Sequence, residues 1–137
     1  MGGNRIYRNL PRRRRKMDET PKEIKPVSTA NAEHYLWGEH SDGWHLLKRD
    51  DVSVIQERVP AGNAELMHYH KISRQFFYIL EGEGQIKFEN EQVCFQKGEG
   101  LEIAPLVRHR FENNSNADVV FLVISVPKSH GDRINVE

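Results

Sequence analysis

Cysteine is nearly absent from this sequence, which has one, Cys94, among 137 residues. A single thiol excludes an intrachain disulfide and any metal site built from several cysteines, and it is typical of a reducing compartment. Long apolar runs are absent too: the longest, 119–124, has six residues, whereas a membrane-spanning helix needs about 20. No secretory signal is recognisable either. We therefore predict a cytoplasmic protein without a membrane segment.

Net charge is the third absence, since 20 Lys and Arg balance 20 Asp and Glu. The zero conceals two unlike parts of the chain. Residues 1–25 carry nine basic and three acidic side chains, a balance of +6, whereas residues 26–137 carry eleven and seventeen, a balance of −6. The sequence therefore predicts a basic tail attached to an acidic body.

Residues 1–26 have the composition of a flexible, disordered tail. The first sixteen contain no acidic residue and few large apolar ones, too few to offset the entropy of ordering the chain. The basic run 12–16 is compatible with a nuclear address, a nucleic-acid-binding arm or an organelle transit segment. It is equally compatible with a solvated leader ahead of Met17 as the usual first residue, which we favour. The acidic body argues against nucleic-acid binding beyond the tail itself.

Residues 27–137 are predicted to form one all-β domain. From residue 52 onward, short apolar or alternating runs are separated by turn residues, and no segment has the pattern of a long helix. The runs are 52–59, 64–70, 75–80, 85–89, 92–96, 101–104, 107–112 and 118–126. A further turn is predicted at Asp42-Gly43, with a strand after it. This many short strands indicates a sandwich or a barrel.

Two of the seven histidines, His68 and His70, stand two positions apart in a predicted strand. Alternate residues of a strand face the same side, so both imidazoles are expected to point to one face, close enough to chelate a divalent ion. The pair alone is weak evidence, because a strand histidine is usually a polar group with an ordinary hydrogen-bond partner.

The residues around these histidines follow a longer pattern. The first part, G-x5-H-x-H-x4-Q-x6-G, comprises Gly62, His68, His70, Gln75 and Gly82. The second part, G-x10-H-x3-N, comprises Gly98, His109 and Asn113. Together they resemble the two motifs of the cupin superfamily, G-x5-H-x-H-x3,4-E-x6-G and G-x5-P-x-G-x2-H-x3-N. The resemblance covers about residues 50–126 and implies a small antiparallel jelly-roll barrel.

Three positions depart from the cupin motifs. Gln75 stands where the family has glutamate, Ala104 where it has proline, and Leu106 where it has glycine. The last two predict a tighter or reshaped loop before His109. The amide of Gln75 cannot act as a general base and neutralises none of a cation's charge, so a bound ion would stay a stronger Lewis acid. Some cupins with three histidines and a glutamine are small isomerases, so the substitution is compatible with an active site.

The resemblance implies that His68, His70 and His109 bind a metal through imidazole nitrogens. Gln75 would add an amide oxygen to this donor set, which suits divalent iron, nickel, zinc or manganese and does not select among them. Strand alternation from these ligands then predicts the wall of a small-molecule pocket, formed by Leu66, Phe77, Ile79, Val107 and Phe111. The same five side chains could instead fill the core of the barrel.

We predict from this site a metal-dependent enzyme that acts on a small, oxygen-rich organic substrate. Isomerase or lyase chemistry is preferred to a dioxygenase reaction, because the neutral Gln75 leaves the ion electron-poor. One alternative is a non-catalytic cupin module that binds a sugar or a small organic acid. Another is a cupin that has lost its metal. The expected partners are a small-molecule substrate or ligand and a second copy in a homodimer, with nucleic acid only through the tail.

Overall fold

The computed structural model describes residues 23–137. The predictions for the basic run 12–16 and for Met17 lie outside the described residues. From residue 23 onward the chain consists of strands, turns and loops without a helix, so the prediction of an all-β fold is confirmed. This part of the chain accordingly offers no helix that could cross a membrane.

Short strands joined by turns make up the described chain, as the alternating sequence predicts. In chain order they are β1 (Glu33–Trp37), β2 (Ser41–Lys48), β3 (Ser53–Val59), β4 (His68–His70), β5 (Arg74–Glu81), β6 (Glu83–Lys87), β7 (Gln92–Gln96), β8 (Gly100–Ile103), β9 (Arg110–Glu112), β10 (Val119–Val126) and β11 (Arg133–Asn135). The turn predicted at Asp42-Gly43 is wrong, because both residues lie inside β2. Gly43 serves packing instead, since the ring of Tyr35 lies where a side chain at this position would be.

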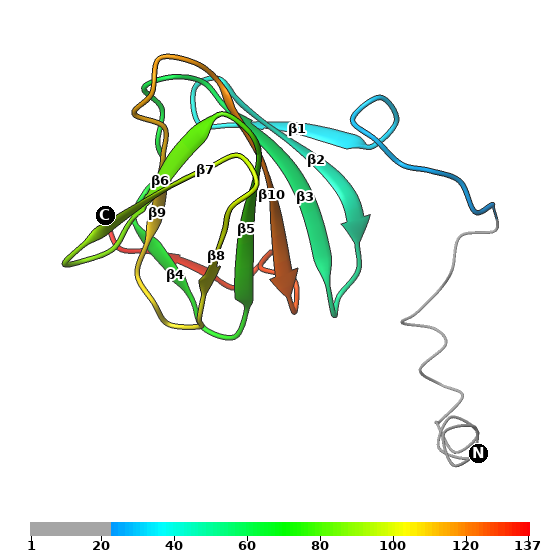
Figure 1. The fold of residues 1–137 in the computed structure, drawn as a ribbon. Coiled ribbons are helices and arrows are strands. Elements are labelled where there is room, and N and C mark those ends of the chain that lie inside the picture. Colours follow the sequence, from blue (N-terminus) through cyan, green and yellow to red (C-terminus); the bar gives the residue numbers. More distant parts are fainter. Residues whose placement is uncertain (1–22) are drawn as a thin grey trace, which may run out of the picture.

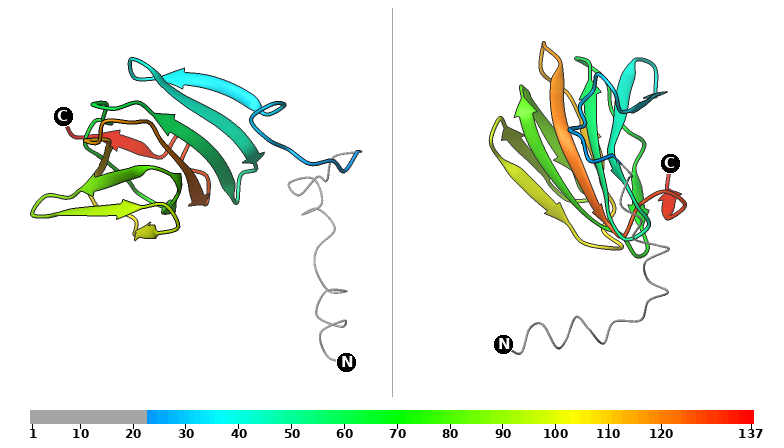
Figure 2. Two further views of the ribbon diagram at one scale, coloured as in Figure 1. Left: turned by 45° about the horizontal axis from the view of Figure 1, so that its top comes forward. Right: turned by 90° about the vertical axis from the view of Figure 1, so that its right-hand side faces the viewer.

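The strands form two larger antiparallel sheets and a two-stranded ribbon (Figures 1 and 2). The larger sheet has the strand order β1-β2-β3-β10-β5-β8, and the smaller has the order β7-β6-β9. In the ribbon, β11 pairs with β4. Two isolated bridges, His68 to His109 and Ala64 to Glu112, tie the segment around β4 to the segment around β9. These links join the ribbon to the smaller sheet, which packs against the larger sheet to complete the antiparallel barrel that the motifs imply.

The hydrophobic core lies inside the barrel and is built by strand alternation. Phe121 on β10 is almost wholly buried, and its ring stacks on Phe111 of β9 with 4.2 Å between the ring centroids. Phe77 on β5 packs against the ring of Phe121, with 5.8 Å between the two ring centroids. The buried apolar residues are Val59, Phe77, Ile79, Ile86, Phe95, Ile103, Phe111, Val119, Phe121 and Val123. Large rings thus fill the centre of the barrel.

The turn between β5 and β6 depends on Gly82. Its φ of 82° is in the left-handed region, which glycine adopts without the steric penalty of a side chain. A Cβ atom here would also lie 2.7 Å from the carbonyl oxygen of Asp118. The last glycine of the first motif therefore has a structural reason: it lets the chain turn against the segment that leads into β10.

We expect Phe121→Ala to lower the free energy of unfolding by about 3–5 kcal/mol, because it removes a buried ring and leaves a cavity beside Phe111. Chemical denaturation followed by fluorescence or circular dichroism measures the change. Phe76→Ala is the matched control: Phe76 lies on the neighbouring strand, faces outward and is 39% exposed, so its loss should cost clearly less. Equal losses in the two variants would contradict this placement of the core.

Candidate metal centre

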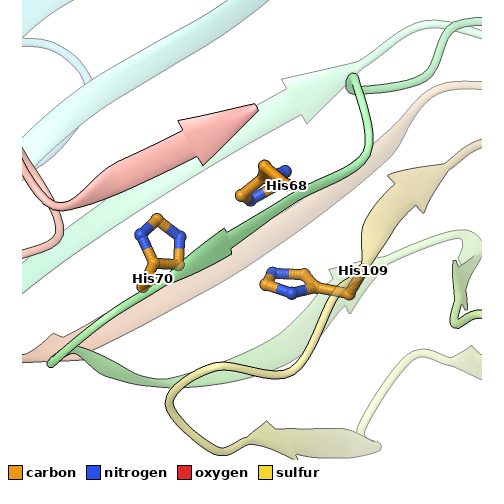
Figure 3. A group of neighbouring side chains, drawn as sticks. All are labelled: His68, His70 and His109. Carbon is orange, nitrogen blue, oxygen red and sulfur yellow. The ribbon is translucent and has the colours of Figure 1, made fainter. Parts of the chain in front are cut away.

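Three histidines from two segments meet at one place in the barrel. His68 and His70 lie on β4, and His109 immediately precedes β9. The backbones of His68 and His109 exchange two hydrogen bonds, with N···O distances of 3.0 and 2.9 Å. One ring nitrogen from each histidine lies within 4.8 Å of the other two, and Figure 3 shows the three rings gathered around one space. The structure thus brings together the histidines that the motifs single out.

A backbone carbonyl fixes the tautomer of each ring. The Nδ1 atoms donate to carbonyl oxygens at 2.7 Å (His68 to Leu66), 3.1 Å (His70 to Asp132) and 2.8 Å (His109 to Val107). Because a carbonyl oxygen only accepts hydrogen bonds, each Nδ1 carries the proton and each Nε2 keeps its lone pair. Outer hydrogen bonds of this kind orient the histidines of metal sites. Each of the three rings therefore presents a nitrogen in the state that a cation requires.

Burial keeps these rings neutral. All three side chains are at most 5% exposed. The loss of solvation lowers the pKa of His68 to about 4, and burial also lowers the pKa of His70 and of His109. A proton therefore competes poorly for the lone pairs at neutral pH, which favours metal binding.

Gln75 on β5 borders the same cavity as His68 and His70. Its amide nitrogen donates to the hydroxyl of Ser125 at 3.1 Å, which fixes the orientation of the amide. Its Oε1 is buried without a hydrogen-bond partner among the described residues, and so is Nε2 of His109. Buried polar atoms of a folded protein are nearly always satisfied, so these two indicate a ligand. The three imidazole nitrogens fit a divalent transition metal ion, and the group could hold one.

The C-terminal segment supports His70 from behind. While the backbone oxygen of Asp132 accepts from this ring, its carboxylate accepts three backbone N–H groups of the turn after β4. The donors are Lys71, Ile72 and Ser73, at 3.1, 2.9 and 2.8 Å. Burial by itself would raise the pKa of Asp132, but the three donors outweigh it and lower that pKa. A residue remote in sequence therefore fixes the turn that follows the first two histidines.

The loop before His109 contains the two departures from the second motif. Leu106 has a φ of 72°, in the left-handed region, where the glycine of the family would cause no steric conflict. Holding a leucine there costs about 1–2 kcal/mol. The N–H of Leu106 donates to the carbonyl oxygen of His70 at 2.7 Å, which anchors the loop to β4. The chain thus retains a backbone conformation suited to glycine although it lacks the glycine.

A cavity of about 790 Å³ adjoins His68 and His70. Of the five side chains predicted to form a pocket wall, Leu66 and Phe77 line this cavity. Ile79 and Phe111 lie in the hydrophobic core instead, and Val107 stands in the loop before His109 with 37% of its surface exposed. Alternation along a strand identifies the inward face, but it does not say how deep in the barrel a residue lies.

The cavity also has a polar wall that the sequence reasoning missed. It comprises Tyr35, Glu57, Glu65 and Arg133. Glu57 alternates with Ile55 and Val59 on β3, a signal that could have placed it inside the barrel. Arg133 lies on β11 and forms a 3.2 Å ion pair with Glu65, a contact between distant segments that no local pattern predicts.

The sequence is similar to that of an uncharacterized protein of Methanocaldococcus jannaschii, with 37% identity over 89 residues that cover 64% of this chain and 71% of that protein. It is also 34% identical over 64 residues to the tetracenomycin polyketide synthase protein TcmJ of Streptomyces glaucescens. This second match covers 45% of this chain and 43% of TcmJ. The chain therefore spans less than half the length of TcmJ.

Two solved structures share the fold. The polyketide cyclase RemF from Streptomyces resistomycificus has a TM-score of 0.73 at 17% identity, over 84% of this chain and 87% of RemF. A sugar phosphate isomerase of the cupin superfamily from Silicibacter pomeroyi has a TM-score of 0.65 at 18% identity, over 74% of this chain and 75% of that one. The family profile described as Cupin domain matches residues 55–125, more than half of the sequence. With its two motifs, its antiparallel barrel and this match, the chain belongs to the cupin family.

Proposed function

We propose that this protein is a metal-dependent enzyme that acts on a small, oxygen-rich organic substrate, through isomerase or lyase chemistry in preference to oxidation by dioxygen. The observation that carries this proposal is the donor set: three buried, neutral histidines and the unpartnered oxygen of Gln75. The adjoining cavity of about 790 Å³ suits a small organic molecule, since such sites span roughly 300–1,000 Å³.

A divalent ion held by the three histidines, with Gln75 as an additional ligand, would polarise an oxygen atom of the substrate. The residues of the chain set the charge of the donor set and the lining of the cavity. Gln75 is uncharged, so it leaves the charge of the ion undiminished for an electron-rich substrate. The apolar side chains of Leu66, Phe77 and Val123 line the cavity and suit the carbon skeleton of such a molecule.

The names of similar proteins support chemistry that needs no dioxygen. TcmJ is a polyketide synthase protein, RemF is a polyketide cyclase, and a third similar protein is a sugar phosphate isomerase. Ring closure and isomerisation both move electron pairs next to a carbonyl group, and neither consumes an oxidant. A polarised substrate oxygen favours both reactions, because it accommodates the electron pair that leaves the neighbouring carbon.

We expect protein purified without chelators to contain close to one divalent metal ion per chain, measured by inductively coupled plasma mass spectrometry. His109→Ala should lose the ion, because it removes one of three nitrogen ligands, whereas the control His40→Ala changes an exposed residue and should retain it. The wild type is then assayed without oxygen on sugar phosphates, 2-oxo acids and poly-β-ketones, and turnover of a member of this panel is expected.

Three results would contradict this function. Protein without metal, whose stability is unchanged by EDTA, would contradict the metal site itself. Turnover that requires and consumes dioxygen would instead support the dioxygenase alternative. Binding of a sugar or organic acid by the metal-loaded protein without any turnover would favour the non-catalytic module.

Gln75→Glu tests the charge argument. Burying a carboxyl group at a 6% exposed position should destabilise the metal-free protein by about 1–3 kcal/mol. Because burial raises the pKa of such a group, the loss of unfolding free energy should grow as pH rises through the range in which a free glutamate ionises. Bound zinc should reverse the loss, since it pairs the new charge. Denaturation with and without zinc measures both effects, with exposed Gln92→Glu as control. Equal destabilisation in both zinc states would contradict Gln75 as a ligand.

Asp132→Ala tests the support of His70. Removing the carboxylate frees three backbone N–H groups of the turn after β4, so the ring should lose its fixed orientation. We expect zinc affinity, measured by competition with a chelating dye, to fall by about 10- to 100-fold. Asp50→Ala is the control, because it removes only an exposed ion pair with Lys128. An affinity within twofold of the wild type would show that the turn holds its shape without Asp132.

A further inference from the structure

A row of side chains crosses the larger sheet from its edge to the core. In register, Tyr35 of β1 lies opposite Gly43 of β2, Gly43 opposite Glu57 of β3, and Glu57 opposite Phe121 of β10. Residues directly opposite one another in a sheet project from the same face. Phe121 is 1% exposed and belongs to the core, so Glu57 and Tyr35 also face the interior, where both line the cavity.

Gly43 brings the phenol of Tyr35 towards Glu57. The Tyr35 ring, including its hydroxyl oxygen, occupies the space that the Cβ atom of any other residue at position 43 would take. The ring therefore lies across β2, the strand that separates β1 from β3. This arrangement accounts for a glycine inside a strand, where it otherwise weakens packing.

Glu57 is an uncommitted carboxyl group on the inner wall of the cavity. Within residues 23–137 its side chain has no hydrogen bond and no ion pair, whereas the neighbouring Glu65 binds Arg133 at 3.2 Å and the backbone N–H of Phe111 at 3.0 Å. Burial raises the pKa of Glu57 well above its ordinary value, and the nearby charge of Glu65 adds to the rise while Arg133 opposes it. Burial likewise raises the pKa of Tyr35, so its phenol stays protonated and can donate.

We propose that Glu57 is the proton-transferring residue of this cavity, with Tyr35 as a neutral hydrogen-bond donor beside it. This inference rests on the proposed function, which requires a proton acceptor that Gln75 cannot supply. A carboxyl group with an ordinary pKa is a weak base at neutral pH, and an acid–base residue works best when its pKa lies near the working pH. The surroundings of Glu57 raise its pKa towards the working pH.

The proposed step is balanced within the substrate and Glu57. The ionised carboxylate takes a proton from a carbon atom next to a carbonyl group, and the electron pair of that C–H bond moves onto the carbonyl oxygen. The protonated Glu57 then gives the proton to the former carbonyl carbon, whose oxygen becomes a hydroxyl group. The hydroxyl group on the carbon that first lost its proton passes its own proton to that oxygen and becomes the new carbonyl group. The step requires a hydroxyl group on the carbon that loses its proton, so the substrate class is a hydroxy ketone or hydroxy aldehyde. Nothing is oxidised or reduced overall.

The test compares wild type, Glu57→Gln, Glu57→Asp and Tyr35→Phe, all loaded with zinc. Glu91→Gln is the matched control, because Glu91 is an exposed glutamate that does not line the cavity. Proton exchange is followed by NMR in D2O as deuterium enters sugar phosphates that carry a hydroxy ketone or hydroxy aldehyde group. Independently of activity, 13C-labelled glutamate carboxyl groups are titrated in zinc-loaded protein, and zinc content is measured for each variant.

We expect Glu57→Gln to lose about 100-fold or more of the exchange rate while it retains its zinc. Glu57→Asp should recover part of that rate, and Glu91→Gln should match the wild type. The wild-type carboxyl signal that is missing from Glu57→Gln should titrate above the other glutamates. Tyr35→Phe should raise KM more than it lowers kcat, because the phenol donates a hydrogen bond and transfers no proton.

Three results would overturn the role of Glu57 and leave the proposed function standing. They are full exchange by Glu57→Gln, loss of its zinc, and a Glu57 signal that titrates with the exposed glutamates. A zinc-loaded wild type that exchanges no proton of any of these sugar phosphates, but turns over another substrate of the wider panel, would overturn this inference alone. A wild type that turns over nothing would overturn the proposed function as well.

Discussion

The pairing of the His68 and His109 backbones is the constraint on which the rest of this structure depends. Two backbone hydrogen bonds of 3.0 and 2.9 Å join segments that lie far apart in the sequence, and they set both the link between the ribbon and the smaller sheet and the position of the third histidine relative to the first two. Because directly opposite residues have Cβ atoms about 4.5–5.5 Å apart, the same bonds that stabilise the fold bring the ring nitrogens of His68 and His109 close together. Fold and site are therefore not independent here: loosening the bridge would separate His109 from the other two donors as it detaches the ribbon from the smaller sheet.

The donors carry an energetic cost that the surrounding backbone offsets in part. Three histidines buried together lose the solvation of both ring nitrogens, and each regains one hydrogen bond through a carbonyl oxygen at Nδ1. The other nitrogen is left for a ligand, and at His109 it is buried without any partner among residues 23–137. A polar atom kept in this state destabilises the metal-free protein and adds to the gain when a cation binds. The same reasoning explains why burial favours the neutral form of each ring.

Local alternation and turn residues were enough to predict the all-β fold and to place His68 and His70 on one face, because both are local properties of the chain. His109 was joined to this pair only through the resemblance to the cupin motifs. The same alternation placed Ile79 and Phe111 on the inward face but could not tell the cavity from the core, which depends on how the sheets close. The Asp42-Gly43 pair predicted a turn because glycine is common in turns, where it adopts backbone conformations that other residues avoid. In the structure Gly43 instead leaves room for the ring of Tyr35. Asp132 and Arg133 reach the site through the pairing of β11 with β4, a contact between distant segments without a local signature.

In the proposed enzyme, Gln75 separates two tasks that a glutamate at the same position would combine. A carboxylate ligand that also accepted a proton would lose its charge as it did so, and the ion would be held less tightly at the moment when the substrate carries most negative charge. With an amide as ligand, the net charge of the donor set stays the same throughout the reaction. Proton transfer then belongs to a group outside the set, and among the carboxyl groups of the polar wall Glu65 is committed to Arg133 and to the backbone of Phe111. Glu57 can change its protonation state without breaking an ion pair, so the neutral ligand and the uncommitted carboxyl group belong to one design.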